Sequence, residues 1–131
     1  MTIYLDENLS EYVAEALNAL SKGYFPNIVV SSTKRVFGRG EADEVIIPKI
    51  GEEGSILITK DFNIKKTQFQ FDLCQQYGLG VFFITLPKGQ DKHWELVKLL
   101  INNWEEIAQK SMRDRRPFAY RLRGKGKMER L

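Results

Sequence analysis

The sequence is short of soft metal ligands. Cys74 is its only cysteine, so an intrachain disulfide is excluded and a reducing, cytoplasmic location is expected. His93 is the only histidine, which leaves too few nitrogen and sulfur ligands for a zinc site. Any metal chemistry must therefore use oxygen ligands, for which Mg²⁺ or Mn²⁺ is the natural choice.

Long apolar runs are also missing. No stretch approaches the ~20 apolar residues that a membrane-spanning helix needs. The N-terminus shows no basic segment followed by an apolar one, as a secretory signal would. We therefore expect no membrane partner. With 131 residues, 43% of them hydrophobic, the chain is large enough for one domain with a real core.

Charge is distributed unevenly along the chain. Residues 1–65 carry seven basic and ten acidic side chains, a net charge of −3. Residues 110–131 carry nine basic and two acidic side chains, a net charge of +7. We therefore expect an α/β domain over residues 1–110 and a basic C-terminal tail over 111–131, partly docked or flexible. Such a tail either binds a polyanion or is simply solvated.

Apolar periodicity predicts strands that alternate with helices. This alternation is typical of a parallel sheet with helices on both faces. Pro48 lies inside one helical pattern, which we expect to be kinked or to end early. Segments 31–40 and 62–67 are expected to be loops. The expected strands are 2–5, 27–30, 55–59 and 81–85, and the expected helices are about 9–20, 41–53, 68–77 and 91–110.

Three acids are predicted to meet at one edge of this sheet. Asp6 and Asp61 follow the first and third strands, and ligands bind outside the carboxyl ends of parallel strands. Asp43 begins the helix that leads into the third strand, so it comes to the same edge. Each acid has a structural alternative, in a turn or at a helix N-terminus. Together they are equally consistent with a divalent-metal site.

Three motifs follow one another along the chain: LDENLS at residues 5–10, GEADEVI at 40–46 and ILITKDF at 56–62. In sequence and in order they resemble the motifs of the small PIN-like proteins, a reduced branch of the PIN nuclease superfamily. Strand 81–85 also fits, and RPFAYRL at 116–122 is similar to the tail of some members. The resemblance implies a three-layer, Rossmann-like α/β domain with about four parallel strands in the order 2-1-3-4.

The resemblance also implies a metal-dependent ribonuclease, and many such proteins are toxins of toxin–antitoxin pairs. Matched motif by motif, Asp6, Asp43 and Asp61 are the predicted catalytic and metal-binding acids. Glu7 and Glu44 stand beside matched acids and are possible further ligands. The usual fourth acid on an early helix has no convincing match, although Glu11 and Glu15 lie on helix 9–20. The alternative is a weak or inactive module that binds nucleic acid or a protein partner.

Several further residues are assigned supporting roles. Asn8 and Thr59 are predicted to orient the carboxylates from a second layer of contacts. Basic residues near the acids and in the tail are predicted to bind RNA, an inference in which the choice of RNA comes from the resemblance. The expected partner is RNA, and the further candidates are an antitoxin protein and a second copy of the chain. The predicted RNA-binding residues are Arg35, Arg39, Lys60, Arg113, Arg115, Arg116, Arg121 and Arg123.

The remaining conspicuous residues are expected to have structural roles. Cys74 is predicted to be a small core residue, and His93 to cap or pack against the last helix. Trp94 and Trp104 lie on one apolar stripe, which favours core packing or a dimer face over base stacking. Residues 69 and 71 are both phenylalanine and cannot share a helix face, so one of them is expected to be exposed.

Overall fold

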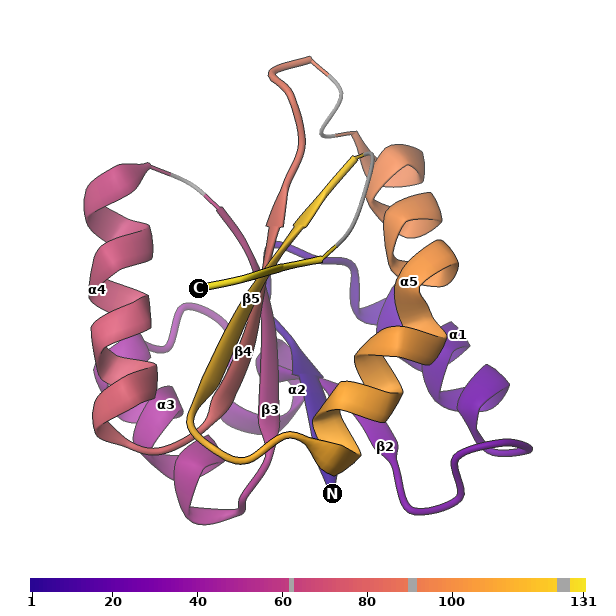
Figure 1. Cartoon of the computed structure of the whole chain (residues 1–131), viewed down its shortest axis with the longest axis horizontal. Coiled ribbons are helices and arrows are strands. Elements are labelled where there is room, and N and C mark those ends of the chain that lie inside the picture. Colours follow the sequence, from indigo (N-terminus) through magenta and orange to yellow (C-terminus); the bar gives the residue numbers. More distant parts are fainter. Residues whose placement is uncertain (62, 90–91, 125–127) are drawn as a thin grey trace.

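The structure, a computed structural model, describes residues 1–61, 63–89, 92–124 and 128–131 (Figure 1). Phe62 of the third motif and residue 91 of the last predicted helix lie outside the described residues. The strands are β1 (Thr2–Leu5), β2 (Val29–Ser32), β3 (Ile56–Lys60), β4 (Gly80–Thr85), β5 (Phe118–Arg123) and β6 (Glu129–Arg130). The helices are α1 (Glu11–Ser21), α2 (Thr33–Phe37), α3 (Asp43–Glu52), α4 (Ile64–Gln76) and α5 (His93–Arg113).

All six of these strands belong to one sheet, in the order β2-β1-β3-β4-β5-β6. The first five are parallel and β6 runs antiparallel to β5. The predicted α/β class and the order 2-1-3-4 are confirmed, but the predicted count of about four strands is wrong. The segment expected as a tail supplies β5 because Phe118, Tyr120 and Leu122 bury their side chains against the neighbouring layers.

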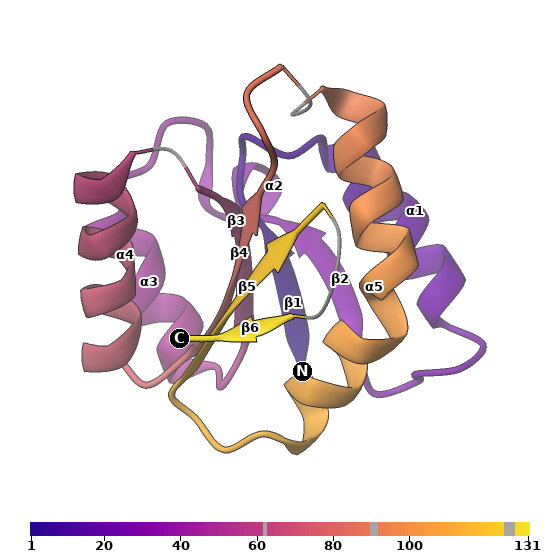
Figure 2. The same ribbon diagram turned by 45° about the horizontal axis from the view of Figure 1, so that its top comes forward.

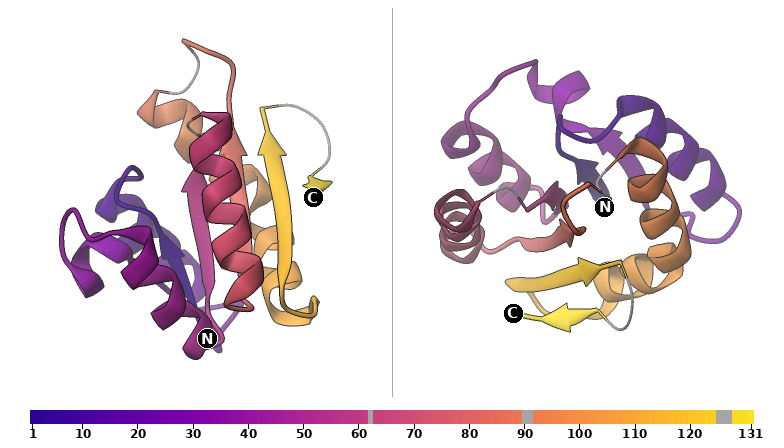
Figure 3. Two further views of the ribbon diagram at one scale, coloured as in Figure 1. Left: turned by 90° about the vertical axis from the view of Figure 1, so that its left-hand side faces the viewer. Right: turned by 90° about the horizontal axis from the view of Figure 1, so that it is seen from above.

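Helices cover both faces of the sheet and make a three-layer domain. Figure 2 shows α1 and α5 on one side and α3 and α4 on the other, and Figure 3 shows the same layers from two further directions. Side chains alternate along each strand, so each face has its own core. Ile58 and Phe82 belong to the core under α1 and α5, whereas Leu57 and Phe83 belong to the core under α3 and α4.

Side-chain caps set the start of two helices. The Ser10 hydroxyl oxygen accepts a hydrogen bond from the Tyr12 N–H at 3.2 Å, so Ser10 caps α1. The Asn63 side-chain oxygen Oδ1 accepts from the Lys66 N–H at 2.9 Å, so Asn63 caps α4, which begins at Ile64. The predicted start near residue 68 is therefore four residues too late, and residues 64–67 of the predicted loop belong to the helix.

The predicted loop over 31–40 is wrong for residues 31–37 and confirmed for residues 38–40. Residues 31 and 32 complete β2, which pairs with all four residues of β1, and α2 follows immediately. The predicted strand 27–30 is consequently shifted by two residues. Polar residues hid this helix, since Ser32 and Thr33 are buried although their side chains do not look like core residues.

Pro48 lies inside α3, which continues through it from Asp43 to Glu52. The predicted early end is therefore not observed. Proline removes one backbone hydrogen-bond donor from the helix. Burial of Ile46, Ile47 and Ile50 on the same helix compensates for that loss, because tertiary packing supplies most of a helix's stability.

The structural predictions for the other conspicuous residues are confirmed in most cases. Cys74 is fully buried, and burial raises the pKa of its thiol to about 12. Trp104 is a core residue that donates its indole N–H to the Ser21 hydroxyl at 2.8 Å, whereas Trp94 is exposed beside His93. Phe69 is the exposed member of its pair. Within the described ranges, no helix is both long and apolar enough to cross a membrane.

Candidate functional site

Backbone hydrogen bonds fix two of the three acids at the carboxyl edge of the sheet. The Asp6 N–H donates to the Ile58 carbonyl at 2.9 Å, and the Asp61 N–H donates to the Ile84 carbonyl at 2.9 Å. Each acid therefore continues the hydrogen-bond ladder one residue beyond its strand. Asp43 is the first residue of α3, which runs back across the sheet from the same edge. The topology thus delivers all three acids where the sequence predicted.

Asp6 is held by three donors. Its Oδ1 accepts from the Glu7 N–H at 2.9 Å, and its Oδ2 accepts from the Asn8 amide at 3.2 Å and from the Thr59 hydroxyl at 2.9 Å. Thr59 is fully buried, so its hydroxyl is a fixed donor. Both residues assigned to orient a carboxylate, Asn8 and Thr59, therefore contact Asp6.

Asp43 is half-buried and lies within the electrostatic reach of Asp6. Burial raises the pKa of the Asp43 carboxyl, and the negative charge of Asp6 raises it further. The Lys66 ammonium acts in the opposite direction. The Gln70 amide donates to Asp43 Oδ2 at 3.3 Å. Two neighbouring carboxylates that repel each other in this way are an environment that a cation would stabilise.

Asp61 has a cation of its own from the protein. The Arg121 Nε–H on β5 donates to Asp61 Oδ2 at 3.1 Å, and the Thr85 hydroxyl donates to the same oxygen. The other carboxylate oxygen, Oδ1, is buried and has no partner among the described residues. Asp61 is therefore engaged on the β4–β5 side of the edge, while Asp6 and Asp43 interact on the β1–α3 side.

The donor chemistry of Asp6 and Asp43 fits a hydrated Mg²⁺ or Mn²⁺. Such ions keep several waters and often use only one or two carboxylates directly. A larger protein ligand set is not preformed: among the described residues, no three His, Cys, Asp or Glu side chains are grouped closely enough to hold an ion. Glu44 is exposed, and Glu7 accepts from the Gly40 N–H at 3.0 Å, which ties the first and second motifs together.

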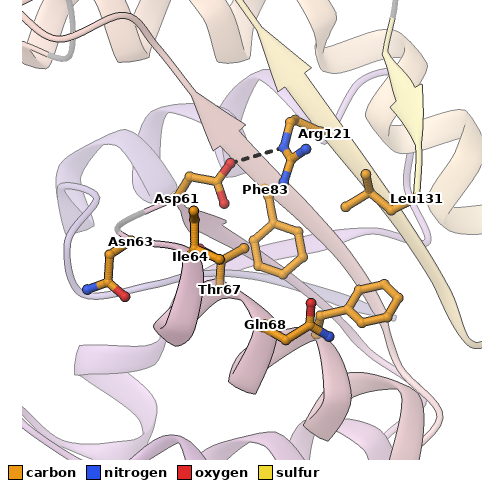
Figure 4. Close-up of a pocket in the computed structure, with 9 residues that line it drawn as sticks. Asp61, Asn63, Ile64, Thr67, Gln68, Phe83, Arg121 and Leu131 are labelled. Atoms are coloured by element: carbon orange, nitrogen blue, oxygen red, sulfur yellow. Dashed lines mark hydrogen bonds and ion pairs between the residues drawn. The ribbon is translucent and has the colours of Figure 1, made fainter.

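A cavity of about 430 Å³ opens beside Asp61 (Figure 4). It lies between α4 and the strands β4 and β5. The Asp61–Arg121 ion pair is drawn at its edge, above the ring of Phe83. The other lining residues are Asn63, Ile64, Thr67, Gln68, Phe71 and Leu131. A second cavity of about 360 Å³ lies on the α1–α5 side and is lined in part by Glu7, Lys60 and His93.

Comparison of the sequence with protein-family models gives a match over most of the chain. The family model described as a PIN like domain matches residues 1–86, which contain β1 to β4 and all three acids. The chain belongs to the PIN-like domain family. Comparison with curated proteins and comparison with solved structures gave no match. PIN-like domains are generally nucleases, so the family is of nuclease type.

The predicted RNA-binding residues of this PIN-like domain do not form one patch around the acids. Arg35 forms ion pairs with Glu11 at 3.3 Å and with Glu15, beside the exposed Tyr12 ring. This pairing also occupies both glutamates that were considered for a fourth acid. Arg121 is the one predicted arginine that is paired with a candidate site acid.

The other predicted basic residues are distributed over the surface. Arg123 pairs with Glu129 at 3.3 Å, and Arg113 lies 3.9 Å from Asp114. Arg116 is half-buried, which lowers the pKa of its guanidinium. Arg39 and Arg115 are exposed, and Lys60 lines the second cavity. Their binding to RNA stays a prediction.

Two residues of this PIN-like domain that contact the acids were not foreseen from the sequence. Thr85 ends β4 and donates to Asp61, and Gln70 on α4 donates to Asp43. Gln70 is almost fully buried, and its Oε1 has no partner among the described residues. A signal for Gln70 existed, because it lies one helical turn before the predicted core residue Cys74 and therefore occupies a core position.

Proposed function

We propose that this PIN-like domain is a metal-dependent ribonuclease that cleaves phosphodiester bonds of RNA by attack of an activated water. The observation that carries the proposal is the repelling pair Asp6 and Asp43 at the carboxyl edge of the sheet, with the pKa of Asp43 raised. Two carboxylates near enough for their charges to repel, one directly after β1 and one at the start of α3, are a suitable seat for Mg²⁺ or Mn²⁺.

The proposed roles follow from the contacts of each residue. Asp6 and Asp43 would hold the ion, which supplies water activation and charge stabilisation when bound. The Thr59 hydroxyl and the Asn8 amide keep the Asp6 carboxylate in one orientation. Gln70 does the same for Asp43. Asp61, neutralised by Arg121, keeps the neighbouring edge from adding a third repelling charge where a phosphate must approach.

The test is cleavage of labelled RNA by the purified chain in Mn²⁺ or Mg²⁺. We expect Asp6→Asn to reduce the cleavage rate by at least about 100-fold, because loss of a preorganised charged group in an active site has an effect of that order. The matched control is Glu105→Gln on α5, an exposed acid with no part in the proposed site, which should stay within about twofold.

The outcome is read together with chelation and folding. Chelation of the divalent ion should stop cleavage by the unchanged chain. Thermal unfolding curves should show that both variants are folded. Equal cleavage by Asp6→Asn and the unchanged chain would overturn the proposal, because it would place the activity in a contaminant or at another site.

A second candidate function is a PIN-like module that binds RNA or a protein partner without cleaving it. The observation that favours it is the engagement of Asp61 by Arg121, which leaves two acids rather than three for an ion. The same cleavage assay separates the two, together with a binding assay on the same RNA. The toxin role and an antitoxin partner are part of our proposal on the resemblance of the motifs alone.

A further inference from the structure

The cavity beside Asp61 has the size and position of a ligand subsite. Its volume of about 430 Å³ lies within the ~300–1,000 Å³ of typical small-molecule sites. The cavity and the carboxyl edge of the sheet share Asp61. Thr59 of β3 donates to Asp6 and lies two residues before Asp61. A strand of RNA that crosses the edge would therefore pass its mouth.

The lining combines three kinds of chemistry. Arg121 supplies a guanidinium, the side-chain type that best matches phosphate oxygens. Phe71, which is only half-buried, supplies aromatic surface, whereas the neighbouring Phe83 is fully buried. Asn63, Thr67 and Gln68 supply neutral hydrogen-bonding groups. Aromatic contact combined with hydrogen bonds to base edges is how proteins recognise unpaired nucleotides.

One hydrogen bond orients the amide that is best placed to read a base. The Gln68 Nε2 donates to Asp72 Oδ1 at 2.9 Å, one turn further along α4. Figure 4 shows the Gln68 carbonyl oxygen on the side that faces Phe83. This arrangement presents an acceptor to the cavity. The second cavity lacks this combination, since neither an arginine nor a phenylalanine lines it.

We propose that this cavity binds one nucleotide of the RNA strand next to the scissile phosphate. The phosphate lies at Arg121, and the base lies against the half-buried Phe71 ring with its edge toward Thr67 and Gln68. This inference rests on the proposed nuclease function for its substrate class. It adds a site that makes cleavage depend on the identity of one base.

The first test measures the binding of nucleoside 5′-monophosphates to the full chain in the absence of divalent ions. Calorimetry or NMR titration gives the affinity. We expect Arg121→Gln to weaken binding at least about tenfold, since it removes a charged hydrogen-bonding group. The matched control is Arg130→Gln, because Arg130 lies on the neighbouring strand β6 over the Tyr120 ring but does not line the cavity. It should stay within about twofold.

The second test concerns the base. Gln68→Leu should change the ranking of the four monophosphates, whereas Gln76→Leu at the end of the same helix should leave it unchanged. Inorganic phosphate is the reference probe. If phosphate binds as tightly as the nucleotides, or if Arg121→Gln and Gln68→Leu bind like their controls, the cavity is not a nucleotide subsite.

The failure of this inference can be told from failure of the proposed function. RNA cleavage that is lost in Asp6→Asn but keeps the same cut positions in Gln68→Leu would retain the nuclease and overturn the subsite. Nucleotide binding that depends on Arg121, in a chain that cleaves no RNA with Mn²⁺, would retain the subsite and overturn the nuclease. Deoxynucleoside monophosphates in the same titration show whether the 2′-hydroxyl is read.

Discussion

Each acid at the carboxyl edge is stabilised in a different way. Asp6 accepts three hydrogen bonds, Asp61 is paired with Arg121, and Asp43 has the Gln70 amide but is half-buried near another negative charge. Asp43 is therefore the acid whose charge costs the fold most. This is the balance expected where a residue serves chemistry rather than stability.

We predict that Asp43→Asn stabilises the protein at pH 7. The pKa of Asp43 is raised by burial and by Asp6, so the folded state favours the neutral carboxyl and loses stability as pH rises through that pKa. A neutral amide avoids this loss. The expected gain is about 1–3 °C in melting temperature. The gain should shrink as the pH falls through the raised pKa of folded Asp43 and should be absent below ~4, where the carboxyl is protonated in both states.

The measurement is thermal unfolding of both proteins across this pH range. Asp72→Asn is the control, because an exposed acid on α4 should show no such pH-dependent gain. A lower melting temperature for Asp43→Asn at pH 7 would mean that the helix N-terminus stabilises the Asp43 charge more than burial and Asp6 destabilise it.

Sequence placed the backbone of these acids correctly but could not supply their partners. Asp6 and Asp61 each follow a strand, and parallel topology then brings them to one edge. Arg121, the partner of Asp61, is 60 residues away in the sequence. It lies on β5, a segment that was predicted to be a basic tail. A pairing of that range depends on where β5 docks, which composition alone does not determine.

Among the elements, β4 and β5 pack closely where the Phe118 side chain of β5 contacts the backbone of Gly80 on β4. Gly80 faces Phe118 in the parallel register, and a β-carbon at position 80 would lie 2.2 Å from the Phe118 ring and 2.8 Å from Ile56 Cδ1. The ring of Phe118 thus fills the space that a side chain would take. Phe82 packs against both Phe118 and Tyr120, with ring centroids 5.5 and 5.7 Å apart.

We predict that Gly80→Ala destabilises the protein by about 1–3 kcal/mol, the usual cost of overpacking a core. The ring of Phe118 is fully enclosed and cannot move aside without disturbing its neighbours. Gly23→Ala is the control, because a β-carbon there meets no atom within 4 Å, and it should change stability by less than about 0.5 kcal/mol. Urea unfolding of both variants gives the comparison. Equal midpoints would show that β5 adapts freely.

Element boundaries were predictable where an apolar pattern was strong. Strands β1, β3 and β4 were each placed within about one residue, because their side chains are apolar and buried on both faces. The short helix α2 was missed because its segment is polar and followed by glycine. The predicted start of α4 was too late because the four residues after its cap, Asn63, have little apolar character.

At the scale of the whole molecule, the family match and the folded unit have different lengths. The match ends at residue 86, yet α5 and β5 lie beyond it and complete the domain. Leu100, Trp104 and Ile107 of α5 belong to the same core cluster as Phe118 and Tyr120. The region with the motifs therefore relies on the last third of the chain for one of its two covered faces.

We predict that a shortened chain ending at Arg115 loses cooperative unfolding. It would lack β5 and expose the edge of β4 together with the ring of Phe82. A chain that ends at Gly124 keeps β5 and removes only later residues, so it should retain a single transition. Circular dichroism melts separate the two cases. A cooperative transition in the chain ending at Arg115 would show that the matched region and α5 fold without β5.

The ladder hydrogen bonds that anchor Asp6 and Asp61 use main-chain atoms only. Substitution of either carboxylate thus changes the charge at the edge without removing a rung of the sheet. Descendants of one ancestral chain can consequently gain or lose chemistry by one or two codon changes while the architecture is inherited intact. For a lineage built on this scaffold, shared fold is a weak guide to shared activity, and the acids themselves are the characters to compare.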